Sequence, residues 1–181
     1  MGLGSVATWL SVSLLLGIGS ATQALVARRI GEQRPKEAGK VLDNALVLGG
    51  ASGLAMGILI YLLAQPIMAL LGSSAQVESL GVDYLSMRTI GFPFVVLNFA
   101  FRGFYHGAGD TRTHLKAILV VHSLNIVLDL LLIFGLLGFP RMGAKGAGLA
   151  TALGLCGGTL YYVLWAVHRT KIRERFDALR W

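Results

Sequence analysis

The sequence predicts an all-α membrane protein, a polytopic bundle of five transmembrane helices. Two observations support this fold class. The 181 residues are 55% hydrophobic with a mean hydropathy of +0.68, and the apolar residues form long blocks rather than short periodic faces. A helix needs about 20 apolar residues to cross about 30 Å of hydrocarbon. We expect helices because backbone polar groups in lipid must be satisfied within their own segment.

Five blocks reach this length, and short connections between them make neighbouring helices antiparallel. We place the spans at about 5–27, 44–71, 84–105, 115–137 and 146–168, followed by a basic tail at 169–181. The second block is long enough to tilt or to begin outside the hydrocarbon. No soluble domain or signal peptide is predicted, and the single cysteine allows no internal disulfide.

Basic residues between the blocks predict the orientation. Thirteen of the sixteen lysines and arginines fall in the loop after the first span, the loop after the third span, and the tail. Positively charged loops face the cytoplasm, so the C-terminus is expected there, in a bacterial plasma (inner) membrane. Met1 would then lie outside, and we expect a preceding span to be missing from this sequence. Because the basic residues lie between the spans, they indicate an orientation in a lipid bilayer rather than binding to nucleic acid.

Two features within the spans concern packing. Gly49, Gly53 and Gly57 recur every four residues, as do Gly154 and Gly158. Small faces at this spacing let helices approach closely, and ordinary bundle packing is favoured over a dimer interface. In the third span, the proline of GFPF at 91–94 removes a backbone hydrogen bond and should kink the helix.

The fourth span contains the sequence SLNIVLDLLLIFG at 123–135, with a carboxylate, Asp129, near mid-membrane. Such a charge costs about 2.5–3.5 kcal/mol on insertion scales. Asn125 lies one turn away on the same face, and Thr151 on the next span has comparable depth, about 8–12 Å below the outer surface. Carboxylate, amide and hydroxyl oxygens suit Na⁺, or a proton held by the carboxyl. The alternative is a neutral Asp129 hydrogen-bonded to a neighbouring helix.

Four further residues are candidates for a cavity or gate: Gln23, Pro93, Asn98 and His122. Gln23 either lines a cavity or packs between helices. Asn98 and Arg102 are one turn apart, which is typical of an interfacial arginine and its partner. His122 is either a packed polar residue or a proton relay.

The sequence contains no catalytic serine–histidine–aspartate set, metal cluster or nucleotide motif. The segment HGAGDTR at 106–112 is glycine-rich but follows no strand, so a tight turn is favoured over a phosphate loop. The tail RTKIRERFDALRW could lie on an anionic leaflet or form a solvated end. The sequence therefore predicts neither an enzyme nor a resident cofactor.

Three segments resemble one transporter family: ALVARRIGEQRPKEAGKVLDNAL, YLSMRTIGFPFVVLNFAFRGFYHGAGDTRTHLKA and NIVLDLLLIFGLLGFPRMGAKGAGLAT. Together they are similar to helices 2–6 of the multidrug and toxic compound extrusion (MATE) transporters, in order. The resemblance implies one incomplete lobe of a twelve-helix, two-lobed exporter. Such exporters move small cationic or amphipathic compounds outward in exchange for Na⁺ or H⁺.

The resemblance also implies a cation site. Asn125 and Asp129 match an Asn/Asp pair on the family's helix 5, and Thr151 matches a threonine on helix 6. The family's helix 1 aspartate and its second lobe have no counterpart here, so we expect both to be supplied as partners. Two alternatives remain. One is a lipid-linked precursor flippase of the same superfamily, against which the few basic residues within the spans argue. The other is a non-transporting membrane fragment or assembly partner.

Overall fold

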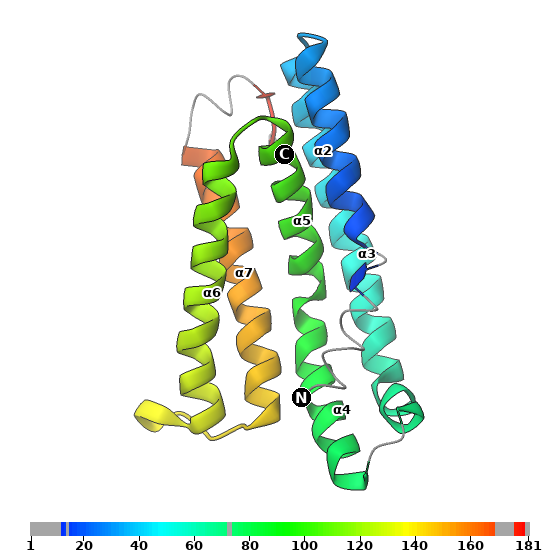
Figure 1. Cartoon of the computed structure of the whole chain (residues 1–181), viewed down its shortest axis with the longest axis vertical. Helices are drawn as coiled ribbons and strands as arrows, with labels where there is room; N and C mark the ends of the chain where they lie inside the picture. The colour runs from blue at the N-terminus through cyan, green and yellow to red at the C-terminus, as the bar shows by residue number, and fades with distance from the viewer. Residues whose placement is uncertain (1–11, 14, 72–73, 169–175, 180–181) are drawn as a thin grey trace.

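The computed structural model describes residues 12–13, 15–71, 74–168 and 176–179. The elements are α-helices joined by short turns, with two 3₁₀ segments (Figure 1). They are α2 (Leu16–Gly31), α3 (Pro35–Leu70), α4 (Ala75–Arg88), η1 (Thr89–Gly91), α5 (Phe92–Gly107), α6 (Thr111–Phe134), η2 (Leu136–Gly138) and α7 (Ala144–His168). The predicted all-α bundle is confirmed. Part of the first predicted span, 5–27, lies outside the described residues.

Among the described residues, four helical segments are long and apolar enough to cross a membrane: Pro35–Leu70, Ala75–Gly107, Thr111–Phe134 and Ala144–His168. The second predicted span began at 44, whereas α3 begins at Pro35. Proline is well placed in the first turn of a helix, where its missing N–H has no partner to lose. The charged residues after Pro35 extend the helix beyond its apolar part, so α3 is longer than the predicted apolar span.

Helix α5 is the centre of the bundle. It contacts α2 and α3 on one side and α6 and α7 on the other, as Figure 1 shows. Toward the end of α5 near Gly107, an aromatic core forms around Tyr162 of α7. Its ring stacks on Phe101 at a centroid distance of 5.1 Å and on Tyr105 at 5.5 Å. This aromatic contact fixes α7 against α5.

The outer surfaces of the bundle remain apolar. Large exposed side chains include Leu62 on α3 and Ile126 on α6, which are 69% and 61% exposed. A water-soluble protein of this size rarely exposes such large contiguous apolar patches. These surfaces are therefore suited to contact lipid, as expected for spanning helices.

Glycines on α3 create a close seam with α5. A Cβ atom at Gly53 would lie 2.7 Å from the Cα of Pro93, and one at Gly57 would lie 3.0 Å from the carbonyl oxygen of Thr89. Gly49 faces Val96 in the same way. The predicted packing within the bundle is thus confirmed for this glycine series, because its small face is already covered by α5.

The run from α4 to α5 is interrupted by the 3₁₀ turn η1, which ends two residues before Pro93. Proline cannot donate to a preceding helical carbonyl, so the α-helix restarts at Phe92 with Pro93 in its first turn. The interruption agrees with the kink that the sequence predicts. The interruption begins directly after Arg88, the last residue of α4.

The turn at 106–112 joins α5 to α6. Gly109 has φ +79°, a conformation that glycine adopts without a Cβ penalty. Asp110 then caps α6, since its carboxylate accepts from the Thr113 N–H at 3.1 Å and from the Thr113 hydroxyl at 2.6 Å. The prediction of a tight turn is confirmed.

Residues 176–179 return to the bundle. The ring of Phe176 packs edge-on against Phe104 at 5.2 Å, and Phe176 and Ala178 are buried. The Leu179 N–H donates to the Asp43 carboxylate at 3.0 Å. For Phe176 and Ala178 the alternative of a solvated end was wrong, because they pack against α3 and α5. The rest of 169–181 lies outside the described residues.

Candidate functional site

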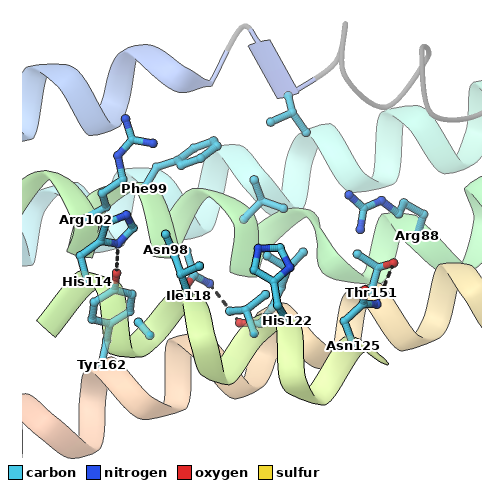
Figure 2. A pocket seen from close by; sticks show the side chains of 15 residues that line it. Arg88, Asn98, Phe99, Arg102, His114, Ile118, His122, Asn125, Thr151 and Tyr162 are labelled. Carbon is cyan, nitrogen blue, oxygen red and sulfur yellow. Dashed lines mark hydrogen bonds between the residues drawn. The ribbon is translucent and has the colours of Figure 1, made fainter. Parts of the chain in front are cut away.

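A cavity of about 390 Å³ opens beside α5, between that helix and α6 and α7 (Figure 2). Its walls combine apolar residues with a set of polar and basic side chains. That set consists of Arg88, Asn98, Arg102, His114, His122, Asn125, Thr151 and Tyr162. The size and mixed lining are typical of a small-molecule site.

Two of the predicted cation ligands meet on the cavity wall. The Asn125 amide of α6 donates to the Thr151 hydroxyl of α7 at 3.4 Å. The Thr151 hydroxyl in turn donates to the Ala147 carbonyl at 2.9 Å. A Cβ at Gly154 would lie 3.3 Å from the Cβ of Asn125, so a small residue is what allows α6 and α7 to approach here.

Asp129 lies one turn beyond Asn125 on α6. It is partly buried and does not line the cavity. Among the described residues it forms no hydrogen bond or ion pair. The structure therefore brings Asn125 and Thr151 together and places Asp129 beside them, without a contact to either.

Arg88 is a cavity residue that sequence reasoning treated only as a charge near the start of a span. Its Nε and Nη1 atoms are buried and have no hydrogen-bond partner among the described residues. A Cβ at Gly148 of α7 would lie 3.1 Å from the Arg88 backbone nitrogen, which shows how closely α7 packs against the end of α4. The available sequence signal was a basic residue four positions inside the predicted span 84–105.

Asn98 links α5 to α7. Its amide nitrogen lies 3.0 Å from the Leu155 carbonyl and 2.9 Å from the Thr159 hydroxyl, and 2.7 Å from the Phe94 carbonyl of its own helix. The expected pairing of Asn98 with Arg102 was wrong. Asn98 makes these interhelical contacts instead, which fix one wall of the cavity.

The other end of the cavity is formed by Arg102, His114 and Tyr162, as Figure 2 shows. The Arg102 guanidinium lies over the Phe99 ring at 6.0 Å. The His114 Nδ1 and the Tyr162 hydroxyl are 2.6 Å apart, which joins α6 to α7. His114 and Tyr162 were not among the predicted site residues, because one histidine and one tyrosine carry no recognisable spacing.

The three remaining candidate residues lie in different parts of the bundle. His122 lines the cavity and is exposed. Gln23 lies on an exposed part of α2 and is not a cavity residue. Pro93 lines a second pocket of about 310 Å³ beside α3 and α5. Of these, only His122 shares the cavity with Asn125 and Thr151.

Residues 1–131 match the family model MatE. This chain belongs to the MatE family. It is 32% identical over 148 residues to the probable multidrug resistance protein NorM of Bacillus cereus, which covers 79% of this chain and 32% of that protein. It is 31% identical over 171 residues to a FAD transporter of Shewanella oneidensis, which covers 91% of this chain and 37% of the relative.

Solved MATE structures share the fold. One is described as the inward-facing conformation of a multidrug resistance MATE family transporter, with 27% identity, a TM-score of 0.84, and coverage of 99% of this chain and 41% of the other. A second is described as the outward-facing conformation, with 27% identity, a TM-score of 0.85, and coverage of 99% and 38%. The chain thus spans about two fifths of these structures.

The chain is thus part of a family of multi-pass membrane proteins whose members are transporters and not enzymes. The resemblance to part of one MATE lobe, inferred from three sequence segments, is confirmed. The chain spans about a third of the length of the curated relatives it matches.

Proposed function

We propose that these helices form part of one lobe of a cation-coupled exporter. The transporter moves drugs or metabolites out of the cell in exchange for Na⁺ or H⁺. The other helices, including the family's first helix and its second lobe, come from the same polypeptide or from another copy. The observation that carries this proposal is the meeting of Asn125 and Thr151 on a cavity wall, one turn from Asp129.

The coupling chemistry follows from these side chains. Na⁺ is a hard cation that accepts carboxylate, amide and hydroxyl oxygens as ligands. An ionised carboxylate within a membrane is costly, so binding of a cation or a proton at Asp129 relieves that cost. A conformation that offers better access to Asp129 is then favoured when the ion is present.

The lobe is proposed to move as a unit. The chain matches inward-facing and outward-facing transporters equally well, with TM-scores of 0.84 and 0.85. Equal similarity supports a lobe that keeps its internal packing while access alternates around it. Rocking of one repeat against another is a general mechanism in transporters of this kind.

We further propose a bacterial inner membrane location, with the α5–α6 turn and residues 176–179 on the cytoplasmic side. The excess of basic residues in the connecting segments at this end supports that orientation. The relatives' names, a multidrug resistance protein and a FAD transporter, support export of amphipathic small molecules.

Substitution of Asp129 in the complete transporter tests the coupling. In proteoliposomes, Asp129→Asn should lower ethidium efflux driven by a Na⁺ or pH gradient about 10-fold or more, the size of a typical coupling effect. Asp83→Asn is the matched control, because Asp83 pairs with Lys145 at 3.3 Å outside the cavity. Ion-driven efflux that is equal in the wild type and in Asp129→Asn would refute the assigned role.

A further inference from the structure

We propose that the cavity beside α5 binds an anionic group of the exported substrate, a phosphate or a carboxylate, and that Arg88 holds it. This inference rests on the proposed function, since it names the substrate class for that transporter. The charge that it assigns to the substrate group is opposite to that of the cationic substrates that the family resemblance implies.

The charges around the cavity have one sign. Arg88 and Arg102 line it, and no aspartate or glutamate does so among the described lining residues. A guanidinium stays protonated in proteins, so at least two positive charges face this space. A cavity with apolar walls and one sign of charge concentrates the opposite ion.

The Arg88 guanidinium has N–H donors for which the described residues provide no acceptor. Its Nε and Nη1 atoms are buried and have no hydrogen-bond partner in the described part of the chain, whereas the ion pairs found there lie elsewhere, at partly or fully exposed positions. Leaving buried charged donors unsatisfied is costly, and more so at membrane depth. A planar guanidinium presents paired N–H groups that match the oxygens of a phosphate or carboxylate.

The surroundings of Arg88 supply further donors. Figure 2 shows Arg88, Thr151 and Asn125 at the same end of the cavity. The Asn125 amide has two N–H groups, and the bond to Thr151 uses one of them. The second N–H is available to an oxygen of the ligand. This end of the cavity therefore combines a guanidinium and an amide donor.

Arg102 plays a different part. It lies fourteen residues after Arg88, about 21 Å along the helices at 1.5 Å per residue. It is exposed and its guanidinium lies over Phe99. Solvent screens such a charge, so Arg102 attracts an anion toward the cavity but holds it less firmly than Arg88.

The test compares two fluorescent probes that differ by one phosphate, riboflavin and riboflavin 5′-phosphate. Binding to the purified complete transporter is measured by fluorescence titration. The phosphate-bearing probe should bind about 10-fold to 100-fold more tightly, as expected for charge-assisted hydrogen bonds. Arg88→Gln should remove this preference and Arg88→Lys should keep part of it, because lysine retains the charge without the planar fork.

Two other variants locate the effect. Arg102→Gln should reduce the preference less than Arg88→Gln does. Lys145→Gln removes a positive charge at the same end of the bundle but outside the cavity, so the preference should persist. Phosphatidylglycerol in nanodiscs should not compete with the phosphate-bearing probe. Competition by this lipid would assign the anion to a lipid headgroup and would overturn the assignment to the exported substrate.

Equal affinity for the two probes would overturn the proposal. So would an Arg88→Gln variant that keeps the phosphate preference, whatever its melting temperature, since Arg88 would then not hold the phosphate. Ion-driven ethidium efflux separates this failure from that of the proposed function. If such efflux persists while the preference is absent, only the anion site is wrong.

Discussion

The two sides of α5 differ in how they are packed. Toward α3, glycines bring the helices so close that a Cβ at Gly53 would approach the Pro93 backbone to 2.7 Å. Toward α6 and α7, the same helix borders a cavity of about 390 Å³ with basic and amide side chains. The glycine contacts themselves leave no room for a ligand, and the pocket of about 310 Å³ lies beside them. On the other side, the stacked rings around Tyr162 pack one end and the larger cavity with polar side chains occupies the rest. Close backbone packing therefore dominates the first face of α5, and the larger cavity lies on the second.

The largest expected effect comes from filling the close seam. Gly53→Ala should destabilise the protein by about 1–3 kcal/mol, since the new methyl group meets backbone atoms that cannot turn aside. Thermal unfolding in detergent measures the change. Gly50→Ala is the matched control on the same helix, because its Cβ would lie 3.9 Å from Leu97 Cδ2, an ordinary contact.

A Gly53→Ala variant as stable as Gly50→Ala would contradict the division between the faces. Both substitutions replace glycine by alanine within α3, so the intrinsic gain in helix propensity is the same for each. The difference between them therefore isolates the contact with Pro93.

A smaller effect is expected on the cavity side. Asn98→Ala removes the side-chain contacts to Leu155 and Thr159, and interhelical hydrogen bonds in membranes contribute about 0.6–1.7 kcal/mol. Thermal unfolding should show a loss in this range. Ser52→Ala serves as control, because the Ser52 hydroxyl donates within α3, to the Gly49 carbonyl at 3.3 Å, and to no other helix that the structure describes. Equal melting temperatures for Asn98→Ala and Ser52→Ala would show that Asn98 does not join the helices.

The difference between the faces also explains what the sequence could predict. The seam follows from one helical repeat of glycines, a local pattern that specifies its own packing. The pairing of Asn125 with Thr151 was predictable because both lie at calculable depths on consecutive spans. The inward position of Arg88 was not, since it depends on the 3₁₀ turn η1 and on the approach of α7 at Gly148. The place of His114 and Tyr162 in the cavity was likewise not predictable, because a single histidine and a single tyrosine form no sequence pattern.

Residues 176–179 pack against α3 and α5, so they add to the closely packed side of the bundle. Asp43→Ala removes the acceptor of the Leu179 N–H, at 3.0 Å, and should speed hydrogen exchange of that amide by about 10-fold, the equivalent of one hydrogen bond. Global unfolding should change little. Unaltered exchange at Leu179 would mean that burial of Phe176 and Ala178 alone holds the segment.

The smallest expected effect lies at the turn between α2 and α3, outside both faces. Hydrogen bonds from Arg28 and Arg29, both 2.9 Å, hold the pKa of Glu32 below its usual range. A depressed carboxyl pKa stabilises the fold above the pKa of the unfolded chain, and this contribution is lost as pH falls through the folded value. Solvent screens an exposed ion pair, so Glu32→Gln should barely alter thermal unfolding at neutral pH.

Carboxyl NMR titration of Glu32 measures this directly. The pKa should rise toward its ordinary value in Arg28→Gln, because Arg28 is the first cause of the depression. Arg34→Gln is the control, since Arg34 pairs with Glu37 at 3.7 Å and does not contact Glu32. If the pKa of Glu32 rises equally in both variants, the depression comes from the combined positive charge of the loop and not from the specific hydrogen bonds. The charges at this end would then act together, as the positive-inside rule treats them, rather than as defined pairs.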